Sequence, residues 1–127
     1  MATEVNAADV VAEVTQAFEH YNRVLDAGDV TAINACFWSS PHTVRFGPTE
    51  NLFGYDEIAG YRSGQWKAGP PRILERLAIT TLGRDFATTN AVFRRSDAPG
   101  RSRQSQTWAR FPPGWRIIAA HVSVLPG

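Results

Sequence analysis

The second half of the chain contains four long segments in a row that have the composition of β-strands. They are rich in Ile, Val, Thr and aromatic residues and span residues 72–83, 85–95, 102–111 and 115–125. Gly83, the turn at residues 96–100 and the Pro-Pro-Gly sequence at residues 112–114 separate them. Long strands joined by short turns pair with their neighbours, so this half predicts an antiparallel meander.

The first third of the chain carries apolar residues at helical spacing instead. Between residues 9 and 27 they recur every three or four positions, at Val11, Val14, Phe18, Tyr21 and Leu25. This spacing forms one apolar stripe and predicts a long helix that ends at Gly28. Asp29 is then placed to cap a short second helix, which has to end before Pro41.

The middle of the chain has shorter patterns. Residues 42–47 and 50–53 resemble two short strands, and Gly54 precedes a predicted third helix over residues 55–65. Helices followed by a meander are typical of an α+β fold, with N-terminal helices packed on a curved, mainly antiparallel sheet. A chain of 127 residues has single-domain size, so residues 1–127 are expected to form one domain with a small-molecule cavity between helices and sheet.

The charge balance excludes several classes of partner. Thirteen basic and twelve acidic residues nearly cancel, so the chain lacks the field that attracts nucleic acid or an anionic membrane. No apolar run approaches the roughly 20 residues that span a bilayer, and the N-terminus lacks a signal-peptide pattern. The single cysteine, Cys36, forms no internal disulfide, which favours a reducing, cytoplasmic location.

The last predicted strand has apolar side chains on both faces. Unbroken alternation assigns Trp115, Ile117, Ala119, His121, Ser123 and Leu125 to one face, and Ile118, Ala120, Val122 and Val124 to the other. Since helices cover only one face of the sheet, a second copy is expected to cover the other, giving a homodimer or a larger homo-oligomer. His121 is expected to be a structural residue at that contact.

The strand before it is unusually polar. Alternation places Gln104, Gln106 and Trp108 on one side of residues 102–111. Two amides and an indole either line a ligand cavity, where they bind carboxylate oxygens or urea N–H groups, or are buried against a neighbouring subunit. The cavity is the preferred interpretation, because buried amides would otherwise lack hydrogen-bond partners.

Several strings of the sequence resemble a known family. They are FWSSPHTVRFGPTENLFG at residues 37–54, GRDFA at residues 83–87 and GRSRQSQTWARFPPGWRIIAAHVS at residues 100–123. From about Val14 to Leu125 the chain resembles the AtzH-like family, within the cone-shaped nuclear transport factor 2-like (SnoaL-like) superfold. The superfold alone implies little about function, because it hosts isomerases, hydrolases and binding modules.

The AtzH-like resemblance implies a role in the catabolism of ureido compounds, oxalurate and s-triazine fragments. The implied activity is hydrolysis of a small dianion, 1,3-dicarboxyurea, by an amidohydrolase. The family's proposed active-site tyrosine and arginine match Tyr21 and Arg45 here. Family members often carry an arginine three residues after the position of Arg62, where this chain has Gln65.

From the residues alone, Tyr21 is either a core tyrosine or a hydroxyl donor in the cavity. Arg45 alternates with two apolar neighbours, so its guanidinium points either inward or to solvent. An inward guanidinium needs an anion, which Glu50 or a carboxylate ligand can supply.

Three further candidates are expected at the rim of the cavity. Tyr61, Arg62 and Arg72 come from the third helix and the start of the meander. As rim residues they either close over an anionic substrate or are ordinary surface side chains.

The patterns of other chemistries are missing from the sequence. It has no Cys or His cluster at metal spacing, no glycine-rich phosphate loop and no nucleophile elbow, so no metal or cofactor is expected. Cys36, beside Phe37 and Trp38, is expected to pack in the core.

Two main hypotheses follow. The first is a cofactor-independent hydrolase in which Arg45, with Arg62 or Arg72, binds a carboxylate, Gln104 and Gln106 orient the urea, and Tyr21 meets its carbonyl. The second is a non-enzymatic protein that binds a small acid or a neighbouring amidase. An isomerase or dehydratase would instead need an inward carboxylate base, for which Glu50 is the candidate.

Overall fold

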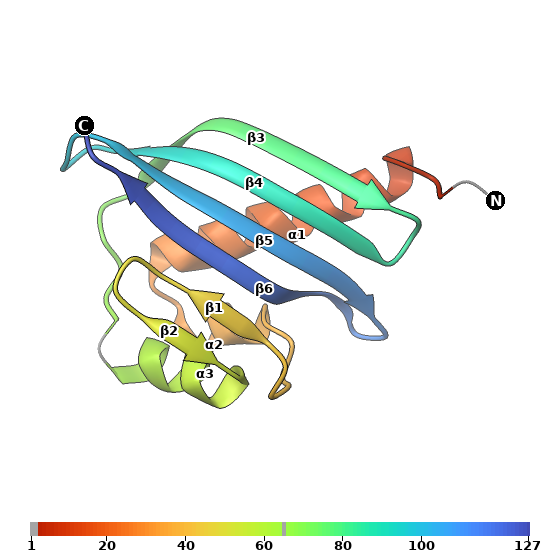
Figure 1. Ribbon diagram of the computed structural model, residues 1–127, viewed down its shortest axis with the longest axis horizontal. Coiled ribbons are helices and arrows are strands. Elements are labelled where there is room, and N and C mark those ends of the chain that lie inside the picture. Colours follow the sequence, from red (N-terminus) through yellow and green to blue (C-terminus); the bar gives the residue numbers. More distant parts are fainter. Residues whose placement is uncertain (1–2, 65) are drawn as a thin grey trace.

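The computed structural model describes residues 3–64 and 66–127, which form three helices and six strands (Figure 1). The helices are α1 (Ala8–Ala27), α2 (Val30–Ala35) and α3 (Tyr55–Gly64). The strands are β1 (Val44–Phe46), β2 (Asn51–Phe53), β3 (Arg72–Leu82), β4 (Phe86–Arg95), β5 (Arg101–Phe111) and β6 (Gly114–Leu125). Each predicted element is present, with bounds that differ by a few residues.

The strands form one mixed sheet in the order β2-β1-β6-β5-β4-β3. β3 to β6 make the predicted antiparallel meander, and β1 joins its edge by running parallel to β6, where Arg45 pairs with Ala120. All three helices precede β3 in the chain, and no helix interrupts the run from β3 to β6, so the long strands lie side by side without crossovers (Figure 1). This confirms the predicted α+β arrangement.

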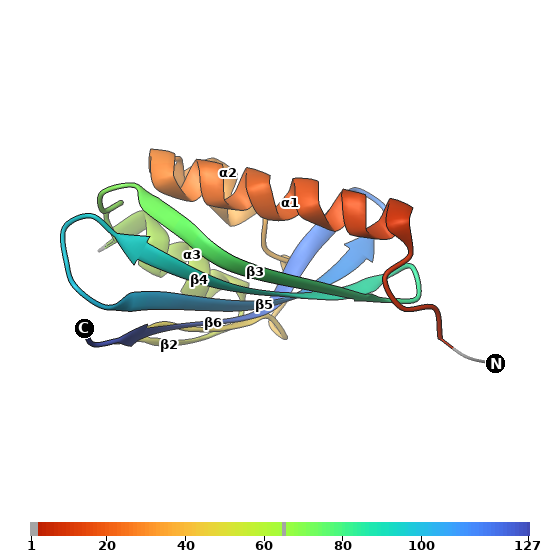
Figure 2. The same ribbon diagram turned by 90° about the horizontal axis from the view of Figure 1, so that it is seen from above.

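Helix α1 crosses one face of the sheet (Figure 2). Its stripe buries Val10, Val14 and Phe18, so the first inward residue is Val10 and not the predicted Val11. The helix ends as expected, because Gly28 adopts a left-handed conformation with φ of 71°. Asp29 caps α2 through a 3.2 Å hydrogen bond that the Ala32 amide donates to its Oδ1.

The alternation predicted for the last strand is wrong beyond Ile117. The pairing of β5 and β6 passes from Trp108 with Ile117 to Thr107 with Ala119, so Ile118 is an extra residue on β6. Such a bulge reverses which side chains face inward. Ile117 and Ala120 are therefore both buried on the helix side.

Because of the same bulge, the His121 side chain lies on the outer face of the sheet, whereas the Ile117 side chain lies on the helix face. His121 is exposed, and its ring meets the ring of Phe46 edge-on, with centroids 5.8 Å apart. The inward position next to it belongs to Val122, which reaches the cavity described below. A single inserted residue thus decides which β6 side chains belong to the site.

Candidate functional site

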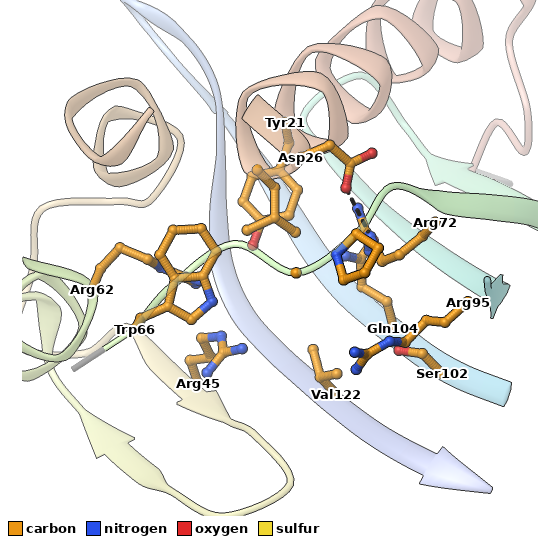
Figure 3. A pocket seen from close by; sticks show the side chains of 13 residues that line it. Tyr21, Asp26, Arg45, Arg62, Trp66, Arg72, Arg95, Ser102, Gln104 and Val122 are labelled. Atoms are coloured by element: carbon orange, nitrogen blue, oxygen red, sulfur yellow. Dashed lines mark hydrogen bonds and ion pairs between the residues drawn. The ribbon is translucent and has the colours of Figure 1, made fainter. Parts of the chain in front are cut away.

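A cavity of about 180 Å³ lies between α1, α3 and the sheet. Four of its lining residues are arginines, namely Arg45, Arg62, Arg72 and Arg95. Figure 3 shows Arg45 and Arg62 on one side of it and Arg72 and Arg95 on the other, with Tyr21 between them. We call this space the arginine-lined cavity.

Strand β1 turns Arg45 inward, which settles the alternative left open by its alternation with apolar residues. The residue is 7% exposed, and its Nη1 donates a 2.6 Å hydrogen bond to Oε1 of Glu50. Burial of Glu50 acts to raise its pKa, but the hydrogen bonds from Arg45 and Thr49 outweigh this and the pKa lies below its usual value. Glu50 is therefore an ionised partner of Arg45.

Gly47 makes room for this ion pair at the end of β1. A Cβ at position 47 would lie 1.8 Å from Glu50 Oε1 and 2.9 Å from Arg45 Nη1. The chain therefore needs glycine there if the Glu50 carboxylate is to fold back over the strand onto Arg45.

Arg62 is buried inside the molecule, and the prediction that it lies at the rim is wrong. It is 1% exposed, because α3 turns Ile58 and Arg62, four residues apart, toward the sheet. The Trp66 ring covers its guanidinium, with 4.6 Å between Cζ and the ring centroid. Within the described residues, none of its three guanidinium nitrogens has a hydrogen-bond partner.

A buried, unpaired guanidinium is energetically costly, because burial removes its hydration and no hydrogen bond replaces it. For a buried ion this loss is on the order of several kcal/mol. Burial accordingly lowers the pKa of Arg62. The neighbouring Arg45 adds positive charge, and its own Nε also has no partner among residues 3–64 and 66–127. This side of the cavity is thus prepared for an anion.

Tyr21 reaches the cavity from α1, as the functional alternative for this residue requires. It is 2% exposed, and its ring packs edge-on against Phe37, with centroids 5.9 Å apart. Figure 3 shows its hydroxyl directed into the cavity. The ring belongs to the core while the hydroxyl is available to a ligand.

The opposite side of the cavity is organised by Asn22, which sequence reasoning missed. Its Oδ1 accepts hydrogen bonds from Arg72 Nη2 at 2.9 Å and from Gln104 Nε2 at 3.2 Å. Arg72 also donates to Asp26 through Nε at 3.0 Å. A signal was present, since Asn22 is a polar residue four positions after Phe18 on an apolar helix face.

Two residues of the polar strand lie deeper than predicted. Gln106 and Trp108 do face the helices, as alternation predicts, and both are buried. Trp108 donates from Nε1 to Thr89 Oγ1 at 3.0 Å, and that hydroxyl lies 3.2 Å from Gln106 Oε1. Neither is among the described residues that line the arginine-lined cavity, so of this strand's three candidates only Gln104 reaches it.

The remaining predicted residues are placed as follows. The ring of Tyr61 is half-buried and lies 5.9 Å from Arg45 Cζ, but Tyr61 is not among the described lining residues. Gln65 falls outside the described residues. Arg95 and Trp66, neither of them predicted, line the cavity.

Metal chemistry has no visible ligand set in the part of the chain that the structure describes, where no three His, Cys, Asp or Glu residues cluster. Cys36 is 7% exposed, and burial raises the pKa of its thiol to about 11. Its Sγ donates to the Ala32 carbonyl at 3.4 Å. Cys36 is therefore a packed core thiol, as predicted.

Comparison with protein families gives a match over nearly the full length: the AtzH-like family model matches residues 3–127. The chain belongs to the AtzH-like family. A search of curated proteins gives no match. The family resemblance that the strings at residues 37–54 and 100–123 carry is thereby confirmed.

Solved structures confirm the fold of this AtzH-like protein. A protein of unknown function from Pectobacterium atrosepticum is 45% identical, with a TM-score of 0.92 over 95% of this chain and 94% of that one. A cystatin-like fold protein from Burkholderia xenovorans is 43% identical, with a TM-score of 0.94 over 99% of both chains. A nuclear transport factor 2-like superfamily protein from Salmonella enterica is 28% identical, with a TM-score of 0.72 over 94% and 93%.

The AtzH-like chain thus has the nuclear transport factor 2-like fold. None of the helices in the described ranges has the length and apolar character that crossing a membrane requires.

Proposed function

We propose that this AtzH-like protein is a cofactor-independent hydrolase of a small carboxylated urea, of the kind represented by 1,3-dicarboxyurea. The observation that carries the proposal is the buried Arg62 guanidinium, for which the described residues supply no acceptor. A planar carboxylate is the ligand that matches a guanidinium with two parallel hydrogen bonds. The ligand class therefore begins with a carboxylate on the Arg62 side.

The size and charge of the cavity support a small dianion. A volume of about 180 Å³ corresponds to roughly six water molecules at ~30 Å³ each. Arg62 meets one carboxylate, and Arg72 and Arg95 face the other end of the ligand. Arg45, Arg72 and Arg95 already have acidic partners, Glu50, Asp26 and Asp97, so the net positive charge that remains is modest and local.

In this proposal the central carbonyl of the ligand lies next to the Tyr21 hydroxyl, which is directed into the cavity (Figure 3). Hydrolysis adds a water oxygen to the carbonyl carbon, the C–N bond breaks, and the departing nitrogen takes up a proton. For 1,3-dicarboxyurea the departing fragment is carbamate, and the fragment that keeps the carbonyl is N-carboxycarbamate. Negative charge develops on the carbonyl oxygen during the addition. The Tyr21 hydroxyl donates a hydrogen bond to this oxygen, with the guanidinium groups of Arg45 and Arg62 lowering its energy further.

The direct test follows 1,3-dicarboxyurea by ¹³C nuclear magnetic resonance with and without the purified protein. Because this compound also decomposes unaided, the expected result is a loss rate that rises in proportion to protein concentration above the spontaneous rate. Saturable binding without any increase in rate would assign the cavity to a non-enzymatic acid-binding or amidase-accessory protein instead.

The ion pairs favour these two functions over an isomerase or dehydratase. Proton abstraction from a substrate needs a carboxylate free to act as base. Glu50 is held by Arg45, and Asp26 is held by Arg72. Both carboxylates therefore serve to position arginines.

We also propose that a second copy of the chain covers the outer face of the sheet. Phe46 and Phe53 lie edge-on to each other there, with ring centroids 5.5 Å apart, and Phe53 is 59% exposed. Light scattering on wild-type protein is expected to give about twice 14.0 kDa at micromolar concentration. Phe53→Glu is expected to give the monomer mass, whereas Val5→Glu, at an equally exposed position, leaves the dimer intact.

A further inference from the structure

We propose that Gln104 is a fixed hydrogen-bond acceptor in the arginine-lined cavity, so that the site selects acids that carry an N–H over acids of the same shape that lack one. This inference rests on the proposed function for the class of ligand, a small carboxylate. It adds that the ligand carries an N–H group in addition to that carboxylate. The argument depends on the order of donors and acceptors along three side chains: Arg72, Asn22 and Gln104.

The first step fixes Asn22. A guanidinium only donates hydrogen bonds, so the Asn22 atom that lies 2.9 Å from Arg72 Nη2 has to be the oxygen. The other end of the amide gives the same result, because Asn22 Nδ2 lies 2.9 Å from the Phe18 carbonyl oxygen, which only accepts. A rotated Asn22 amide would face a donor with a donor and an acceptor with an acceptor.

The second step fixes Gln104. The same Asn22 oxygen lies 3.2 Å from one end of the Gln104 amide, and only the NH₂ end can donate to it. Arg72 therefore determines the orientation of Gln104 through Asn22. Arg72, which can only donate, is connected to Gln104 by two hydrogen bonds through Asn22. The Gln104 amide atom that does not bond Asn22 is therefore the carbonyl oxygen.

The third step concerns the oxygen that remains. Gln104 lines the cavity and is 3% exposed, and its Oε1 accepts no hydrogen bond from residues 3–64 or 66–127. Leaving such a buried acceptor unpaired costs about 1–3 kcal/mol. Its neighbour across the β5–β6 pair is Val122, which offers no donor from its side chain. A ligand N–H supplies the missing donor.

The cavity thus presents complementary demands on its two sides. Arg62 requires an acceptor, which a carboxylate provides, and Gln104 requires a donor, which a ureido or amide nitrogen provides. A ureido acid satisfies both. A keto acid or an all-carbon diacid satisfies Arg62 but leaves Gln104 Oε1 buried against a methylene group.

The test compares two stable dianions that differ by one group. N-oxalylglycine carries an N–H where 2-oxoglutarate carries a CH₂, and their shapes are otherwise alike. Isothermal titration calorimetry with the full chain is expected to show at least about tenfold tighter binding of N-oxalylglycine, the ratio that one satisfied buried hydrogen bond gives. Equal affinity of the wild-type protein for both compounds would overturn the inference without any variant.

The variant Gln104→Met keeps the length of the side chain and removes its acceptor. The ratio of the two affinities is expected to fall to about one, mainly through weaker binding of N-oxalylglycine. Gln106→Met is the matched control, because Gln106 lies two residues away on the same face but bonds Thr89 outside the cavity. It is expected to keep the wild-type ratio.

The outcomes separate this inference from the proposed function. A preserved ratio in a folded Gln104→Met protein overturns the inference and leaves anion binding in place. The expected ratio without hydrolysis of carboxylated ureas supports the inference and overturns the hydrolase. Failure of the wild-type protein to bind either dianion at millimolar concentration overturns both.

Discussion

Arg62→Met is expected to make the ligand-free protein more stable while weakening the binding of a carboxylated ligand at least 100-fold. Arg62 is 1% exposed, and its guanidinium has no acceptor among the described residues. Methionine retains much of the apolar stem that packs there and removes the charge. Replacing buried charges by apolar residues of similar volume has raised stability by about 1–4 kcal/mol in other proteins.

The measurement is thermal unfolding with and without a dianion such as N-oxalylglycine. At about 100 times the wild-type Kd the ligand should stabilise the wild-type protein by about 2.7 kcal/mol, whereas it should stabilise Arg62→Met by no more than about 0.4 kcal/mol if binding is 100-fold weaker. Arg94→Met serves as control, because Arg94 is exposed and already paired with Glu75, 3.4 Å away. A variant at position 62 that is strongly destabilised and still binds would mean that Arg62 is a structural residue.

The placement of Arg62 also shows where sequence reasoning stops. Its position in the third helix was predicted, but the helix was treated as a rim element. Ile58 lies four residues earlier, and residues at that spacing share a helix face, so the buried isoleucine carried the information. What the sequence lacks is the reason to bury a cation there, because in our proposal that reason is the ligand.

Strand alternation had the same mixed success. It placed Gln104 inward correctly, because β5 is unbroken from Arg101 to Thr107 in its pairing with β6. It failed on β6, where the extra residue Ile118 reverses the pattern, so that Val122 and not His121 shares a face with Ile117. Bulges depend on how two strands match in length and twist, and periodicity in one strand does not contain that information.

The Asn22 contacts were beyond prediction for a related reason. The Asn22 oxygen joins α1 to β3 and β5, through Arg72 and Gln104, across sequence separations of 50 and 82 residues. A polar residue on an apolar helix stripe indicates that a partner exists. Only the packing of the helix across the meander identifies that partner.

Tyr21→Phe is expected to lower kcat for a carboxylated urea by roughly 100-fold or more while changing KM by less than about threefold. A hydrogen-bond donor directed at a developing oxyanion contributes about 10²–10³ to kcat, because it strengthens only as the charge appears. The ring remains to pack against Phe37, 5.9 Å away between centroids. Since this packing is retained, the substitution should change Tm by only a few degrees.

Tyr61→Phe is the matched control for Tyr21→Phe, since Tyr61 lies near Arg45 but is not among the described residues that line the cavity. Its kcat is expected to stay within about threefold of wild type, well short of the loss of a transition-state donor. The ratio of the two effects separates a hydroxyl that meets the reacting carbonyl from one that only helps to surround Arg45. If Tyr21→Phe raised KM and left kcat intact, the hydroxyl would bind the ground state as strongly as the transition state. The charge on the carbonyl oxygen would then have to be met by Arg45 and Arg62 alone.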